Sequence, residues 1–296
     1  MESVQKLTHI EHILKRPDSY VGPVDLNVEP YWVLNGDNSQ FEKNNLKYSP
    51  ALLKIFDEIL VNAVDRNSMH PKHVTSISVA IDKVSGSVTV ENNGPIGGVG
   101  VRMHEKEGIW NPELTFGHLL TSTNYDDSKK RVVGGRNGYG AKLTNIYSSS
   151  FSIVIKDHET KQTYTQKWSN NMTVCEQPKI KKHAGATSSV SITFTPDWKR
   201  FGMPKMDFAI YKIFQKRVWD ANICSTPNCK VKFNGDVLPK QNFDAYAKMH
   251  EGVGEVCSFS NDRWSVCIGP SENGLEQVSF VNGICTTRGG THVDHV

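Results

Sequence analysis

The chain has 296 residues, of which 38% are hydrophobic and 22% are charged, and its formal net charge is +3. These values are ordinary for a soluble globular protein and predict one large domain or two. The charge is too mild to predict nucleic-acid binding by itself. The N-terminal residues lack the apolar core of a signal peptide, and no apolar run reaches transmembrane length, so we expect no membrane segment.

The six cysteines do not form a CxxC pair. Cys224 and Cys229 are close in sequence, but no histidine cluster accompanies them, which argues against a zinc site. The pattern favours reduced thiols in a cytosolic or nuclear compartment.

The first predicted elements are two helices separated by an irregular stretch. Residues 7–14 have helical spacing, and residues 18–50 mix Pro, Gly, Asn and aromatics, which indicates loop with short strands. A strong helix is predicted over 50–65, because Ser49 can cap it and Pro50 would take its first position.

The helix over 50–65 is apolar almost all round, so it is expected to be buried. Glu58, Asn62 and Asp65 nevertheless recur at i, i+4 and i+7, which places them on one face. Buried polar groups are costly unless they are satisfied. The stripe is therefore either an internal hydrogen-bond network, a solvated edge, or a cleft wall where Glu58 handles a proton and Asn62 offers an oxygen to a metal.

A predicted hairpin follows, with strands over 74–81 and 87–91. Its second strand runs into Asn92-Asn93-Gly94 and a glycine-rich loop. Such a loop can place an amide beside a base or a ribose, although a plain surface turn has the same composition.

The most distinctive stretch is the glycine-rich loop from Gly134 to Lys142. Glycines let a backbone approach a ligand closely, and a helix predicted over 138–149 would point its N-terminus at the loop, as in phosphate sites. Ala141-Lys142-Leu143 lacks the hydroxyl of a P-loop, and the dinucleotide fingerprint is also absent. If the loop binds a phosphate group, it therefore belongs to another class of phosphate site. The alternative is that it is a flexible loop.

The remaining predicted elements are helices over 112–121 and 207–221 and a series of strands. Strands are predicted over 151–156, 162–168, 172–175, 189–195, 231–235, 255–260, 264–268 and 277–282. The basic run at 179–183 is expected to be a solvated hairpin end. Helices give way to short strands near Lys240, which predicts domains over 1–240 and 241–296. The last residues lack a polar tail, and we expect the chain to be part of something longer.

Three signals thus stand in order: Glu58-x3-Asn62, the Asn93 loop, and Gly134–Lys142. This order resembles the Bergerat-fold ATPases. Phe56-Asp-Glu-Ile-Leu-Val-Asn-Ala63, the hydroxyl-rich segment 121–127, and Ser279-Phe-Val-Asn-Gly283 with the segment 289–294 are similar to eukaryotic-type DNA topoisomerase II. The resemblance covers nearly the whole chain. It implies an α/β (α+β) sandwich whose mixed sheet is covered by helices, followed by the start of a ribosomal-S5-like transducer domain.

The resemblance also implies a role for each matching position. Glu58 would be the general base for the hydrolytic water, Asn62 the Mg²⁺ ligand, and Asn93 the acceptor for adenine. Contacts to ribose, phosphate and the lid over the triphosphate of ATP would come from Ser122, Thr123, Asn124, Gly135, Arg136, Asn137, Gly138, Tyr139, Gly140, Ala141 and Lys142. The implied assembly is a homodimer that acts on DNA through the full-length enzyme.

The sequence also departs from this family in several places. The N-terminal tyrosine would align with Ser3 or Val4, and a threonine near adenine would fall at Val190. The Gln-Thr-Lys switch loop and the DNA-cleaving tyrosine of the family have no match in residues 1–296. We therefore expect this chain to bind nucleotide but to hydrolyse it poorly, to dimerise weakly, and to be unable to cut DNA.

Two alternative functions are weighed against this interpretation. One is a related ATPase of the chaperone or mismatch-repair type, which segments 121–127 and 279–294 argue against. The other is a catalytically inactive interaction or DNA-binding module, which the intact Glu58, Asn62 and Lys142 argue against. The expected location is the nucleus if the protein is cellular, or the host nucleus, a cytoplasmic virus factory or the virion if it is viral.

Overall fold

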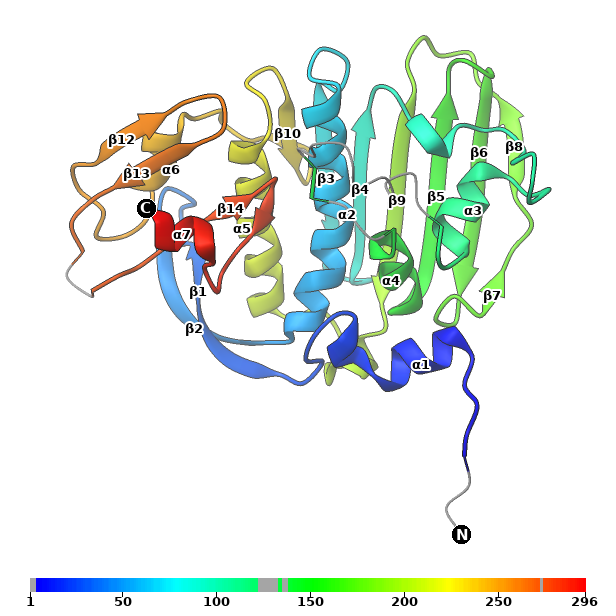
Figure 1. Ribbon diagram of the computed structural model, residues 1–296, viewed down its shortest axis with the longest axis horizontal. Helices are drawn as coiled ribbons and strands as arrows, with labels where there is room; N and C mark the ends of the chain where they lie inside the picture. The colour runs from blue at the N-terminus through cyan, green and yellow to red at the C-terminus, as the bar shows by residue number, and fades with distance from the viewer. Residues whose placement is uncertain (1–3, 122–132, 135–137, 272–273) are drawn as a thin grey trace.

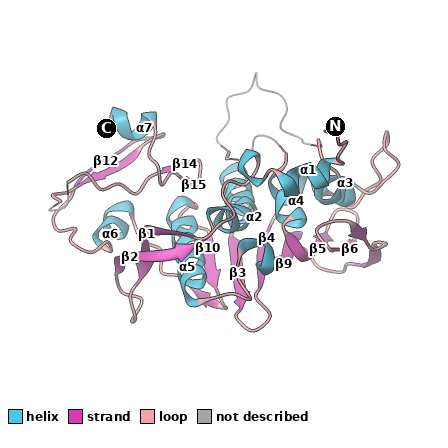
Figure 2. Cartoon of the chain, turned by 90° about the horizontal axis from the view of Figure 1, so that it is seen from below, coloured by secondary structure: helices cyan, strands magenta, loops and turns pink. Residues whose placement is uncertain are grey.

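The computed structural model describes residues 4–121, 133–134, 138–271 and 274–296. A large mixed sheet carries a layer of helices on one face, as Figure 2 shows edge-on. Its strand order is β11-β10-β3-β4-β9-β5-β6-β7, and β8 pairs separately with β6. Among these pairs only β10 with β3 is parallel, within the described residues. The predicted mixed sheet covered by helices is therefore confirmed.

The strands of this sheet are β3 (Ser76–Asp82), β4 (Ser87–Asn93), β5 (Ser148–Asp157), β6 (Gln162–Ser169), β7 (Val174–Cys175), β8 (Lys179–Lys182), β9 (Ser189–Pro196), β10 (Lys230–Phe233) and β11 (Asp236–Val237). Burial alternates along β3, β4 and β5, because every second side chain faces the helices. The basic run at 179–182 is exposed as expected, but it forms a paired strand rather than a hairpin end.

Two long helices, α2 (Pro50–Met69) and α5 (Phe208–Cys224), pack against each other over the sheet, with α4 (Gly140–Ile146) on the other side of α2 (Figure 1). Ser49 Oγ accepts a hydrogen bond from the backbone N of Leu52, and Pro50 begins α2, as predicted. The helix ends four residues later than the predicted boundary at 65. Helix α4 is shorter than the predicted 138–149, because β5 already begins at Ser148.

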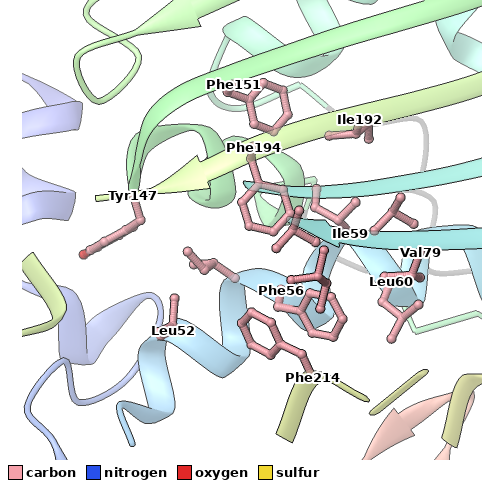
Figure 3. Packing of buried hydrophobic residues seen from close by; sticks show 14 of the residues in the cluster. Leu52, Phe56, Ile59, Leu60, Val79, Tyr147, Phe151, Ile192, Phe194 and Phe214 are labelled. Atoms are coloured by element: carbon pink, nitrogen blue, oxygen red, sulfur yellow. The ribbon is translucent and has the colours of Figure 1, made fainter. Parts of the chain in front are cut away.

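The main core lies between the helix layer and the sheet. Phe56 of α2 and Phe214 of α5 stack with ring centroids 4.1 Å apart, and both are fully buried (Figure 3). Ile192 and Phe194 of β9 and Phe151 of β5 contribute to the same core from the sheet. This contact fixes α2 over the middle of the sheet, and the same helix carries the polar stripe.

Residues 18–50 are more regular than their composition predicts. They contain a hairpin of β1 (Asn27–Leu34) and β2 (Phe41–Tyr48), which forms a sheet of its own beside α5. Much of the hairpin is exposed, so the alternation that marks a strand is weak in the sequence. Packing against α5, rather than local preference, stabilises it.

The remaining helices are α1 (His9–Lys15), α3 (Asn111–Gly117), α6 (Phe243–Lys248) and α7 (Thr291–His295). The remaining strands form two small hairpins, β12 (Cys257–Ser260) with β13 (Ser265–Ile268), and β14 (Phe280–Val281) with β15 (Ile284–Cys285). Residues after 240 gather at one end of the molecule (Figure 1). Tyr246 and Met249 nevertheless share a small core with Leu34, Phe41 and Trp219, so this segment is anchored to the preceding part.

Candidate functional site

A cavity of about 1070 Å³ opens along one side of α2. Its wall includes residues of α2, α3 and α4, and Val90, Asn92, Val190 and Ile192 from neighbouring strands β4 and β9. Its size is at the upper end of the range for small-molecule pockets, and its mixed polar and apolar lining is typical of them. The cavity is therefore the candidate site.

The predicted stripe on α2 lies in this cavity. Glu58, Asn62 and Asp65 all line it. Glu58 pairs with Lys54 one turn earlier, with Oε1 and Nζ 2.5 Å apart, while Asn62 makes no side-chain hydrogen bond to another described residue. Asp65 is buried and accepts a hydrogen bond from the backbone N of Gly134 at 2.9 Å, which holds the start of the glycine-rich loop against α2.

Helix α4 presents its N-terminal residues to the same cavity. Gly138, Tyr139, Gly140, Ala141 and Lys142 all line it. Gly140 lies directly against Glu58, and a Cβ added there would overlap the carboxylate, so any larger residue would require the Glu58 side chain to move. The backbone at the start of α4 therefore contacts α2 at Glu58 without an intervening side chain.

Lys142 is a buried cation in this wall. Its side chain is only 2% exposed, and Nζ donates to the backbone carbonyls of Thr121 and Gly138 at 2.5 Å each. Burial lowers the pKa of Lys142 to about 8, because no carboxylate within the described residues pairs with it. A cation held only by carbonyl groups can exchange these partners for an anion.

The structure places the predicted residue Asn93 outside the cavity wall. Its Oδ1 accepts hydrogen bonds from the backbone N of Thr75 at 2.9 Å and of Ser76 at 2.8 Å, and it is not part of the cavity wall. Its neighbour Asn92 is buried and lines the cavity. Adjacent residues of a strand face opposite sides of a sheet, so only one of the pair can reach the site.

Asn92 is also free to act as an acceptor. Its Nδ2 donates to the backbone carbonyl of Asn93 at 3.1 Å, while its Oδ1 accepts no hydrogen bond from the described residues. Six further predicted positions lie outside the described residues, namely Ser122, Thr123, Asn124, Gly135, Arg136 and Asn137.

No protein-family profile matches the chain. It is 42% identical over 309 residues to DNA topoisomerase 2 of Penicillium chrysogenum, which covers 100% of this chain and 19% of that protein. It is 39% identical to the enzyme of Saccharomyces cerevisiae, covering 22% of it. Among solved structures, the ATPase region of Saccharomyces cerevisiae topoisomerase II superposes with a TM-score of 0.94 and 42% identity, over 98% of this chain and 77% of that one.

The chain belongs to the DNA topoisomerase 2 family. The ATPase and transducer domains of topoisomerase II from Balamuthia mandrillaris also match, with 41% identity and a TM-score of 0.91. The 43K ATPase domain of Thermus thermophilus gyrase B, at 19% identity and a TM-score of 0.58, shares the fold. The resemblance drawn from the motifs is therefore confirmed. The chain spans about a fifth of the length of the curated topoisomerase 2 proteins it matches.

The donor set of this topoisomerase 2 chain fits a hydrated Mg²⁺. No group of three or more His, Cys, Asp or Glu side chains within the described ranges could hold a metal by itself. Mg²⁺ usually keeps several waters and takes one or two protein oxygens plus substrate phosphates. The amide of Asn62, which bonds to no side chain or backbone group in the described part of the chain and lies one turn from Glu58 on α2, suits that arrangement.

Asn92, Arg66 and Ile284 are among the residues of the cavity wall that sequence reasoning missed. Arg66 lies one position beyond the predicted stripe, so extending the stripe by one residue would have found it. Ile284 is the first residue of β15, and its side chain lies, like that of Val61 of α2, against Gly134. No local signal marks that contact, because more than 200 residues separate Ile284 from α2.

Proposed function

We propose that the cavity binds Mg²⁺·ATP and hydrolyses it, and that this closes a dimer gate during passage of one DNA duplex through another. The observation that supports this most strongly is that one cavity brings together Glu58, Asn62 and Lys142, which lie up to 84 positions apart in sequence. The relatives are named as topoisomerases, and the matching solved chains as ATPase regions.

In this proposal each described residue has one task. Lys142 exchanges its two carbonyl partners for phosphate oxygens, and the backbone of Gly138–Lys142 approaches the same group. Asn92, rather than Asn93, accepts a hydrogen bond from the amino group of adenine. Asn62 would hold Mg²⁺, which neutralises charge on the phosphates.

Glu58 is the proposed general base. Its carboxylate accepts a proton from the attacking water and orients that water for in-line attack on the γ-phosphate. Lys54 holds Oε1 of the carboxylate, and the bare Cα of Gly140 leaves room beside it. Both contacts restrict the side chain, which favours one position for the water.

The test is Glu58→Gln in this chain extended through the remainder of its ATPase region. We expect ATP affinity to stay within about twofold while turnover falls about 100-fold or more, since general-base catalysis contributes that much. Near-normal turnover with intact binding would reject the role of Glu58. Asn62→Ala should abolish Mg²⁺-dependent binding, and an unchanged affinity would remove its metal role.

The remaining proposals concern the whole protein. We propose a homodimer that acts on DNA in the nucleus, with a transducer domain that begins near residue 241. The relatives cited above are fungal and protist proteins, so they do not support a viral source. No helix within the described residues is long and apolar enough to cross a membrane. Relaxation of supercoiled DNA by the full-length protein, dependent on ATP, would separate this function from a chaperone or repair ATPase.

A further inference from the structure

Arg66 is a cation in the cavity wall that has no acidic partner among the residues that the structure describes. It lies on α2, next to Asp65, and its Nη2 donates to the backbone carbonyl of Pro95 at 2.5 Å. Within the described residues this is its one hydrogen bond, and no carboxylate lies within ion-pair distance. Most of the five N–H donors of the guanidinium are therefore left for solvent or a ligand.

The guanidinium is held in place although most of its donors are unused. It lies against the Cα of Gly97, where an added Cβ would come within 2.7 Å of both Nη atoms. The side chain is partly buried, and this burial lowers the pKa of Arg66. A charged group that is removed from water without a counter-charge is costly, so its position requires a compensating contact.

Its place along α2 identifies the part of a nucleotide that it can meet. Arg66 lies eight residues after Glu58, which is about 12 Å along a helix. The phosphates are assigned to the Glu58 end, where Gly140 and Lys142 lie. The carbonyl that Arg66 binds follows Asn92 by three residues on the same segment, so the guanidinium and Asn92 share the opposite end of the cavity.

We propose that Arg66 recognises the purine base of the bound nucleotide by stacking its guanidinium plane on the base, with Nη2 still bonded to the Pro95 carbonyl. This rests on the proposed ATP site and names the residue that adds selectivity for the base. Guanidinium groups are weakly hydrated and planar, and they stack on aromatic rings. An ammonium group at this position would lack the flat surface.

The experiment compares a ligand that has the base with one that lacks it. Calorimetric titrations of this chain with ATP and with inorganic tripolyphosphate, both with Mg²⁺, are repeated for Arg66→Ala. Because a stacked, partly desolvated cation contributes to binding, the Kd for ATP should rise about 10-fold, which corresponds to about 1.4 kcal/mol. The Kd for tripolyphosphate should stay within twofold.

A second variant tests whether Arg66 only holds the loop of Pro95. Arg66→Gln keeps an N–H donor for the Pro95 carbonyl but has no guanidinium plane. Its affinity for ATP should therefore be about as low as that of Arg66→Ala. Arg102→Ala is the matched control, because Arg102 is exposed and pairs with Glu159 away from the cavity. This substitution should leave the Kd for ATP and the Kd for tripolyphosphate unchanged.

Three results would overturn the proposal. Recovery of ATP affinity by Arg66→Gln would assign a purely structural role to the side chain. Equal weakening of ATP and tripolyphosphate by Arg66→Ala would show that it meets the phosphates. Unchanged ATP affinity would show that it meets neither. If the unsubstituted chain binds tripolyphosphate and ATP equally poorly, the ATP site itself fails, and this inference fails with it.

Discussion

Arg217 of α5 donates two hydrogen bonds to Oδ1 of Asp57 on α2, from Nε at 2.9 Å and from Nη2 at 2.6 Å. Its Nη1 donates to Asp220 at 2.9 Å, and its Nη2 also reaches the carbonyl of Gly283 in the turn between β14 and β15. Burial alone would lower the pKa of Arg217, but the two carboxylates raise it well above its ordinary value. Asp57, the residue before Glu58, is thus connected through Arg217 to α5 and to the turn between β14 and β15.

Arg217→Met should destabilise the fold. It would remove the partner of Asp57 and leave Asp220 with Lys216 as its remaining cation, and removing one member of a buried ion pair costs up to about 3–5 kcal/mol. The measurement is the free energy of unfolding in urea. Arg102→Met serves as the control, because its pair with Glu159 is exposed and should contribute about 1 kcal/mol or less. An equal loss of unfolding free energy in the two variants would contradict the stabilising role of the buried Arg217.

Gly140→Ala should impair hydrolysis while α4 stays folded. The new Cβ would displace the Glu58 carboxylate, and loss of a positioned general base lowers turnover about 100-fold or more. Alanine is the better helix former, so the loss would not come from helix propensity. Turnover is measured beside circular dichroism. Gly36→Ala is the matched control, since nothing lies within 4 Å of its Cβ position. Equal turnover in the two variants would show that Glu58 tolerates the methyl group.

Nucleotide affinity should fall as the pH rises through about 8. Burial lowers the pKa of Lys142 to about 8 in the free site, and bound phosphate would raise it again. Affinity is therefore full below pH 8, and above it declines by up to about tenfold per pH unit as the free site loses its cation. Titrations between pH 7 and 9.5 measure this decline, and Lys142→Met should bind weakly and without it.

The lowered pKa of Lys142 also distinguishes a loss of nucleotide affinity from a loss of folded protein. Between pH 8 and 10.5 the unfolded chain would hold the Lys142 proton while the folded chain would not, so the contribution of Lys142 to stability rises with pH in that range. A thermal melt at each pH is the control. An identical pH profile for Lys142→Met and the unsubstituted chain would assign the decline to another group.

The sequence by itself determined the elements whose signals are local. Ser49 and Pro50 predict the start of α2, because a cap and a fixed φ act within one turn. The spacing of Glu58, Asn62 and Asp65 predicts their common face, since helical geometry decides it. The motifs read together, from Glu58-x3-Asn62 to the loop of residues 134–142, were sufficient to identify the family, although not to place their side chains.

Tertiary structure alone decided the features that depend on distant partners. Asn92 rather than Asn93 faces the cavity because pairing with β3 and β9 fixes the pleat of β4, and a shift of one residue would reverse it. The hairpin of β1 and β2 depends on packing against α5. Arg217 meets Asp57 across 160 positions of sequence, and no local pattern encodes such a pair. Contacts of this kind form only when packing of the core brings the two helices together.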